Sequence, residues 1–105
     1  MKYGLKPKHI DAIVKIFSGN PNISEAVLFG SRAKGNHKAG SDIDIALKGK
    51  INLKDVLFLH RLIDELNLPY KFDLIIFSQI KEPALIDHIN RVGQTLYGKN
   101  FREYA

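Results

Sequence analysis

Residues 26–47 read AVLFGSRAKGNHKAGSDIDIAL. In this segment a polar loop lies between two apolar stretches. The first stretch, residues 26–29, predicts a short strand that runs directly into a glycine and a serine. The second stretch, residues 41–47, alternates apolar residues with others, which predicts another strand. Because successive side chains of a strand point to opposite faces, Asp42 and Asp44 are expected on the same face.

Three amphipathic segments on either side of this region predict helices, beginning at Pro7, after a capping Asn52, and near residues 78–83. Their apolar stripes are Ile10, Ile13, Val14 and Phe17 in the first, Leu53, Val56, Leu57, Ile63 and Leu66 in the second, and Leu85, Ile86, Ile89 and Val92 in the third. Residues 72–77, nearly all apolar, predict a central strand, and residues 95–97 predict an edge strand. This order predicts an α+β fold, a small mixed sheet flanked by helices, in a single domain over residues 1–105.

Composition narrows the class of protein. The 105 residues are 45% hydrophobic and 26% charged, which is typical of one globular domain and too short for separate cofactor and substrate domains. The 16 basic and 11 acidic residues give a net charge of +5, which favours phosphate-bearing or acidic partners. The absence of cysteine excludes disulfides and thiolate metal sites. No long apolar run or leader-like N-terminus is present, so we expect a cytoplasmic protein without membrane association.

Three aspartates carry the strongest chemical prediction. Asp42 and Asp44 project from one strand face, and Asp73 interrupts the apolar strand at residues 72–77, where a buried carboxylate needs a partner. If the two strands are neighbours, the three carboxylates converge. An all-oxygen donor set suits Mg²⁺ or Mn²⁺ rather than Zn²⁺, and two such ions can stabilise the attacking and leaving oxygens of an in-line displacement. The alternative is a solvated strand face with a bend at Asp73.

Gly30 and Ser31 form the second candidate feature, at the end of the first predicted strand. A glycine lets a phosphate approach the backbone, and a serine hydroxyl can donate a hydrogen bond to it. The spacing to Gly35 does not make a P-loop, because Asn36 and His37 stand where that motif needs Lys and Ser or Thr. Basic residues follow the pair, at Arg32, Lys34, Lys38, Lys48, Lys50 and Lys54. We expect them to form a basic collar around the site, with the alternative of an ordinary lysine-rich loop.

The four histidines, His9, His37, His60 and His88, lack metal-ligand spacing. We therefore expect them to have surface or packing roles. The aromatic residues show no periodic arrangement for stacking bases, so direct nucleic-acid binding rests on net charge alone and ranks last.

Gly30-Ser31 and Asp42-Ile43-Asp44 are separated by ten residues, and a third acid follows at Asp73. Together they resemble the motif of the DNA polymerase β-like nucleotidyltransferase superfamily. The resemblance covers about residues 26–76. Within the superfamily the chain is most similar to the minimal nucleotidyltransferase (MNT) family, antitoxin proteins paired with a HEPN protein that is encoded nearby. The resemblance implies the polymerase β palm-like fold and a protein adenylyltransferase that moves AMP from ATP to a hydroxyl, releasing pyrophosphate. The implied acceptor is a residue of the HEPN toxin, whose RNase activity is thereby silenced.

The resemblance also implies roles for individual residues. Gly30 and Ser31 would hold the triphosphate, and Arg32 would contact a phosphate. Asp42 and Asp44 would bind both metal ions, and Asp73 would complete one metal site and help deprotonate the acceptor.

Two alternatives remain open at this point: a non-catalytic module that masks its partner, and the core of a small-molecule nucleotidyltransferase. The second lacks the acceptor-binding domain that such an enzyme needs. The base preference, the acceptor and the choice between homo- and hetero-oligomer are not determined by the sequence.

Overall fold

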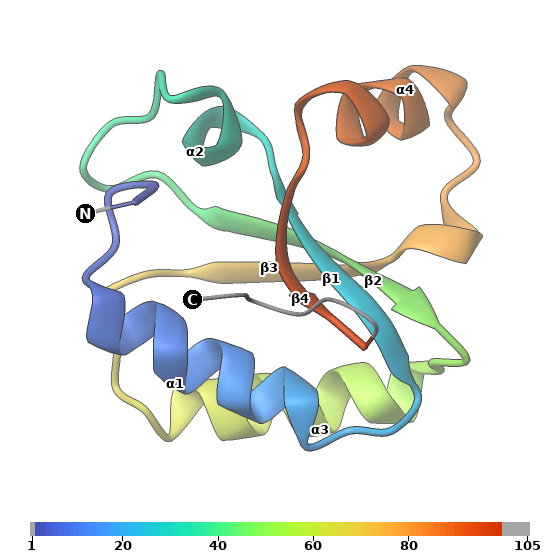
Figure 1. Ribbon diagram of the computed structural model, residues 1–105, viewed down its shortest axis with the longest axis horizontal. Coiled ribbons are helices and arrows are strands. Elements are labelled where there is room, and N and C mark those ends of the chain that lie inside the picture. Colours follow the sequence, from blue (N-terminus) through green and yellow to red (C-terminus); the bar gives the residue numbers. More distant parts are fainter. Residues whose placement is uncertain (1, 100–105) are drawn as a thin grey trace.

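The computed structural model describes residues 2–99, which form one mixed sheet with helices on both faces (Figure 1). The elements in chain order are α1 (Pro7–Ser18), β1 (Ile23–Phe29), α2 (Ser31–Lys34), β2 (Ile43–Gly49), α3 (Leu53–Asp64), β3 (Phe72–Ile76), the 3₁₀ turn η1 (Phe77–Gln79), α4 (Pro83–Val92) and β4 (Gln94–Gly98). The predicted α+β architecture is confirmed. No helix in the described range is both long and apolar enough to cross a membrane.

The sheet order is β3-β2-β1-β4. β1 pairs antiparallel with β2 and with β4, while β2 pairs parallel with β3 through the crossover helix α3. The prediction that residues 72–77 form a central strand is therefore wrong, because β3 lies at an edge. Its apolar residues are explained by burial of Leu74 and Ile76 on one face and partial burial of Ile75 on the other. The edge prediction for residues 95–97 is confirmed by β4.

The two faces of the sheet are packed unequally. One face and the helices α1 and α3 share the larger core, which includes Phe17, Ile43, Ile45 and Leu59. The other face is covered by α4, with the short α2 at the end of β1 (Figure 1). Its buried cluster contains only Val27, Phe29, Ala46 and Ile89. The alternation in β2 is confirmed, because its isoleucines enter the first core and Ala46 enters the second.

Helix α3 begins as predicted and faces the core differently from the prediction. Asn52 accepts a hydrogen bond from the Asp55 N–H at 3.0 Å, and the Asp55 carboxylate accepts one from the Asn52 N–H at 3.1 Å, which completes a capping box. Leu53 and Leu57, expected to point inward, are 65% and 61% exposed. The buried face of α3 consists of Val56, Leu59 and Ile63. The apolar residues of α3 extend over more than one helix face, so the sequence did not specify which side packs.

Candidate active site

The sheet register places two of the three predicted acids, Asp44 and Asp73, side by side on the face covered by α4. Asp44 lies opposite Asp73 in the parallel β2–β3 pair. Asp42 lies just before β2, which begins at Ile43 and not at residue 41 as predicted, and its charge still acts on Asp44. Residues in register on neighbouring strands are separated by about 4.8 Å between strand axes, with side chains on the same face. The expectation that Asp73 is buried is wrong, because an edge position leaves it exposed. Asp73 therefore does not need a partner to offset burial. The two strands are neighbours, as predicted.

Asp44 has the most perturbed environment of the three. Desolvation at its half-buried position raises its pKa above the usual aspartate value, and the negative charges of Asp73 and Asp42 raise it further. When the His88 imidazole carries a proton on both nitrogens, its positive charge acts in the opposite direction and lowers the pKa of Asp44. Among the described residues, none of the three acids takes part in an ion pair. The carboxylates therefore form a concentration of negative charge that no cation within residues 2–99 neutralises through an ion pair.

Gly30 brings the end of β1 close to this charge. The β1–β2 register places Phe29 opposite Asp44, so the next residue passes beside the Asp44 carboxylate. Gly30 has φ 76° and ψ −157°, a backbone region available almost only to glycine. A Cβ atom at Gly30 would lie 2.5 Å from Asp44 Oδ2. Only a residue without a side chain can place the Gly30-Ser31 turn so close to the acids.

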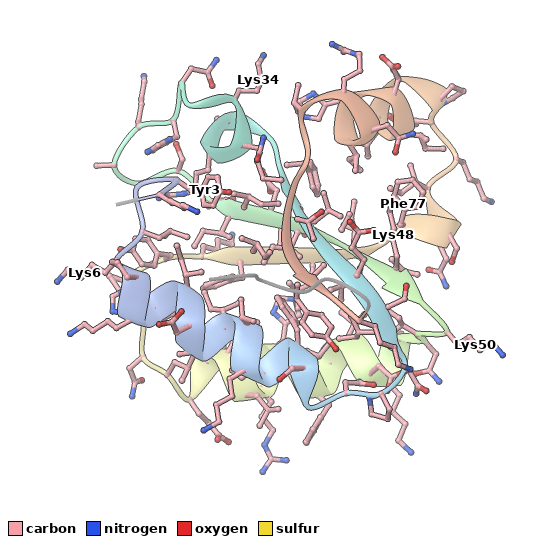
Figure 2. The ribbon with its side chains drawn as sticks, viewed as in Figure 1. Tyr3, Lys6, Lys34, Lys48, Lys50 and Phe77 are labelled. Carbon is pink, nitrogen blue, oxygen red and sulfur yellow. The ribbon has the colours of Figure 1, made fainter. Side chains whose placement is uncertain are left out.

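Arg32 has a different position from the one expected of a phosphate contact. Its side chain is 2% exposed, and its guanidinium donates hydrogen bonds to the main-chain carbonyls of Tyr3, Ala39 and Ser41 at 2.7–3.3 Å. It also lies over the ring of Tyr70, 5.2 Å from the centroid. Figure 2 shows Tyr3 next to α2. In this structure Arg32 ties together the N-terminal turn, α2 and the loop before β2, and does not face the acids.

His88 is a residue of the site that sequence reasoning missed. Its Nε2 accepts a hydrogen bond from the Gly30 N–H at 3.1 Å, and its ring packs edge to face against Phe29 with centroids 6.2 Å apart. One local signal was present in the sequence. His88 is three residues after Leu85 and four before Val92, so it is a polar residue on the apolar stripe of its helix.

The predicted basic collar is only partly present. Lys34 lies at the end of α2, whereas Lys48 and Lys50 lie toward the other end of β2 (Figure 2). Lys48 lies four positions after Asp44 along β2, a distance of about 13 Å. Lys48 is used locally, because its Nζ lies 4.6 Å from the centroid of Phe77 and 3.5 Å from a Glu25 carboxylate oxygen. Closeness in sequence overestimated the positive charge near the acids.

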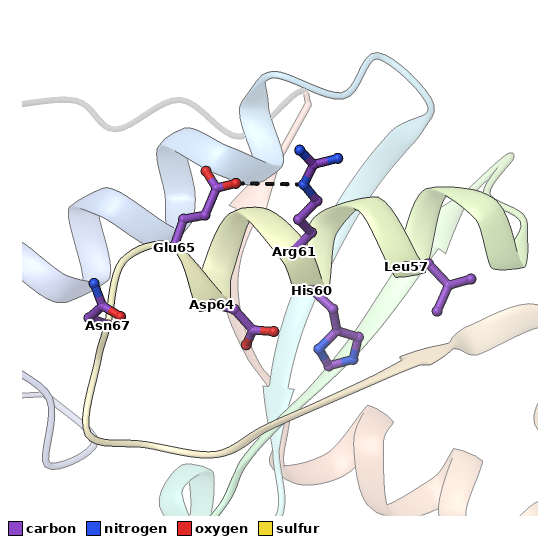
Figure 3. Close-up of a pocket in the computed structure, with 6 residues that line it drawn as sticks. All are labelled: Leu57, His60, Arg61, Asp64, Glu65 and Asn67. Atoms are coloured by element: carbon purple, nitrogen blue, oxygen red, sulfur yellow. Dashed lines mark ion pairs between the residues drawn. The ribbon is translucent and has the colours of Figure 1, made fainter.

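A hollow of about 610 Å³ on the outer side of α3 does not belong to this site. Figure 3 shows its lining, which includes Leu57, His60 and Asp64, with an ion pair between Arg61 and Glu65 at 3.6 Å. The hollow is on the α3 side of the sheet and the acids are on the α4 side. It contains no feature of the predicted site.

A known protein family matches most of the chain. The family model "Polymerase beta, Nucleotidyltransferase" matches residues 11–102. The chain belongs to the polymerase beta nucleotidyltransferase family. The match includes the Gly30-Ser31 turn and all three acids, so the motif and the fold agree with this family. No curated protein sequence matches the chain.

Solved structures of nucleotidyltransferase-fold proteins are similar over most of the chain. A toxin–antitoxin complex with AMP-PNP is 25% identical, with a TM-score of 0.69, covering 87% of this chain and 74% of that chain. A tri-AMPylated Shewanella oneidensis HEPN toxin in complex with its MNT antitoxin is 21% identical, with a TM-score of 0.65 and coverage of 90% and 74%. A Sulfolobus solfataricus nucleotidyltransferase-like protein is 21% identical, with a TM-score of 0.53 and coverage of 86% and 77%. The neighbours include MNT antitoxins, which confirms the resemblance to that family.

Proposed function

We propose that this nucleotidyltransferase transfers AMP from ATP to a hydroxyl group of a HEPN-type partner protein and thereby acts as an antitoxin. The observation that supports the proposal most strongly is the pairing of Asp44 and Asp73 on one sheet face beside the Gly30-Ser31 turn, with Asp42 just before β2. This arrangement offers carboxylates for a metal–triphosphate complex and a turn that a phosphate can approach closely.

The donor set at the acids fits Mg²⁺ or Mn²⁺. All the donors are carboxylate oxygens. The pKa of Asp44 is raised by desolvation and then by repulsion from Asp73 and Asp42, and a bound cation would relieve that repulsion. Within residues 2–99, no three acidic or histidine side chains are close enough to hold one ion by themselves. We therefore assign Asp42 and Asp44 as the principal ligands, with Asp73 joining when nucleotide oxygens and water complete the shell. Two bound ions would neutralise charge on the triphosphate and on the departing pyrophosphate.

The residues of the chain have distinct tasks in the proposed transfer. The Gly30-Ser31 turn orients the triphosphate, with the Ser31 hydroxyl donating to a phosphate oxygen. A bond forms between the acceptor oxygen and the α-phosphorus, and the bond from that phosphorus to the β-phosphate bridging oxygen breaks. The exposed Asp73 carboxylate accepts the proton of the acceptor hydroxyl. Arg32 is not given a phosphate contact in this proposal, because its donors hold backbone carbonyls.

The proposed partner follows from the solved neighbours. The toxin–antitoxin complex with AMP-PNP, at 25% identity, supports both a nucleotide and a toxin partner for this chain. The AMPylated HEPN toxin occurs with a protein that is 21% identical, which establishes the common fold and makes adenylylation the first reaction to test. Asp73 lies on the exposed edge strand, so a partner can reach it without rearrangement of the sheet.

The test incubates the purified chain with Mg²⁺, ATP labelled at the α-phosphate, and the HEPN protein encoded beside it. We expect label on the HEPN protein with the wild type and a loss of at least about 100-fold with the Asp42→Asn/Asp44→Asn double variant, since both principal metal ligands are removed. The matched control is Asp64→Asn, an exposed carboxylate on the outer side of α3 that should transfer label normally. A chelator should abolish labelling.

The outcome also separates the proposal from partner masking. If the double variant still binds and inhibits the HEPN protein, and the wild type transfers no label, the chain is a masking module and adenylyl transfer is rejected. Label on a small molecule instead of the protein would indicate the small-molecule nucleotidyltransferase.

A further inference from the structure

His88 is the side chain from outside the sequence motif that reaches the Gly30-Ser31 turn. It lies on α4, 58 residues from Gly30, and its Nε2 accepts the Gly30 N–H at 3.1 Å. An accepting Nε2 requires the neutral ring to carry its proton on Nδ1. The edge-to-face contact with Phe29, the residue before Gly30, fixes the ring from a second direction.

This hydrogen bond acts on a turn that has little freedom to move. Gly30 passes so close to Asp44 that even a methyl group would not fit. A rotation of the peptide between Phe29 and Gly30 would therefore shift Ser31 relative to the carboxylates. The Gly30 N–H belongs to this peptide and would turn with it, and it is this N–H that donates to His88. While the bond is intact, the Gly30 N–H is not available to a phosphate, and the turn keeps one orientation.

We propose that His88 is a positioning residue, which holds the Gly30-Ser31 turn in the orientation that receives the triphosphate. This inference rests on the proposed function for its ligand, a nucleoside triphosphate. It assigns His88 no contact with the nucleotide and no proton transfer. Loss of His88 should therefore weaken nucleotide binding more than it slows chemistry.

The kinetic test compares His88→Ala with His88→Gln. We expect His88→Ala to raise KM for ATP about three- to tenfold, the value of one neutral hydrogen bond, while kcat changes less. His88→Gln should recover most of the loss, because the Gln Oε1 supplies an acceptor at about the reach of Nε2. The matched control is His60→Ala on α3, which should leave both constants unchanged. Thermal unfolding of each variant checks that it is folded.

A second readout does not depend on activity. In ¹⁵N-resolved NMR at mildly alkaline pH, His88 should show the Nδ1–H tautomer. The Gly30 amide proton should move upfield in His88→Ala and return in His88→Gln. An unchanged Gly30 amide in His88→Ala, or an Nε2–H tautomer, overturns the positioning role even if the wild type transfers AMP.

The two proposals fail separately in this design. A wild type that binds Mg·ATP without transferring AMP, and a His88→Ala variant that binds it more weakly, would reject the transferase and support positioning by His88. Equal ATP affinity in the wild type and His88→Ala overturns the positioning role. A wild type that does not bind ATP overturns both.

Discussion

Asp44 is held in a position that is unfavourable for a charged group. It is half-buried, lies beside two other carboxylates, and has a raised pKa for both reasons. No cation of the described residues pairs with it. Such strain is common where a site is built for a ligand, because the ligand and not the fold compensates the charge.

We predict that Asp44→Asn stabilises the protein at neutral pH while it abolishes transfer. The native pKa is above the unfolded value, so the native state binds more protons between the two, and stability falls as pH rises through this range. Above the native pKa the cost of the ionised Asp44 carboxylate is fully present, and Asn removes it. The melting temperature should rise by a few degrees.

Two further measurements check the cause of that stabilisation. The gain from Asp44→Asn should vanish at a pH below the unfolded pKa, where the carboxyl is protonated in both states. Mg²⁺ should raise the melting temperature of the wild type more than that of the variant. A gain that is independent of pH would show that the charge of Asp44 is not its origin.

Gly30→Ala tests whether the turn needs glycine. The new Cβ would meet Asp44 Oδ2 and would require a positive φ of 76° from an alanine. We expect a loss of about 1–3 kcal/mol in the free energy of unfolding by urea titration, and reduced nucleotide binding. Gly40→Ala is the matched control, because a Cβ there has open space, and it should stay within about 0.5 kcal/mol of the wild type. Equal stability of the two variants would contradict the geometry.

At the level of the secondary-structure elements, Arg32 connects three segments of the chain through the hydrogen bonds of its guanidinium. It belongs to α2, and its guanidinium holds the carbonyl of Tyr3 in the N-terminal turn and that of Ser41 before β2. The residue after Ser41 is the first aspartate of the site. Arg32 therefore sets the position of the loop that leads into the acids relative to the turn that precedes α2.

We predict that Arg32→Lys destabilises the protein although the charge is kept. A lysine lacks the fork that bonds two carbonyls at once and leaves buried acceptors unpaired. The free energy of unfolding should fall by about 2–4 kcal/mol, measured by urea titration. Lys34→Ala, an exposed residue of the same helix, should change it by at most about 0.5 kcal/mol. If Arg32→Lys is as stable as the wild type, the hydrogen bonds of Arg32 do not hold these segments.

The distribution of the core over the two faces predicts how the molecule opens. Fifteen buried residues of the described range form the cluster between the sheet, α1 and α3, whereas four form the cluster under α4. Helix α4 contributes only Ile89 as a fully buried side chain. Its attachment to the sheet is therefore weaker than that of α1 and α3.

Native-state hydrogen exchange should detect this difference. We expect amides of α4 to exchange at least about tenfold faster than those of β1, through local opening that leaves the sheet intact. The amides of α3 provide the internal comparison and should exchange with the sheet. Equal protection of α4 and β1 would show that the helix opens only when the whole domain unfolds. Because α4 carries His88, its opening would also release the Gly30 turn.

The fold could be predicted largely because its elements have strong local patterns. The Asn52 cap, the alternation in β2 and the turn at Gly30 were all recognisable from neighbouring residues. The wrong predictions arose where the pattern of apolar residues was consistent with two arrangements. The apolar β3 is consistent with a central or an edge strand, and α3 has apolar residues on more than one side, so packing against the rest of the chain selected Leu59 over Leu57.

The sequence by itself determined which family the chain belongs to, since the family model matches residues 11–102. Strand alternation fixes Asp44 and Ala46 on one face of β2, and Asp42 lies just before the strand begins. Only the tertiary structure decided that Arg32 turns inward, that Asp73 is exposed at an edge, and that His88 reaches Gly30. These three outcomes depend on strand order and on which helix covers which face. Strand order and helix coverage are set by contacts between residues far apart in the sequence, and the spacing of neighbouring residues does not specify them.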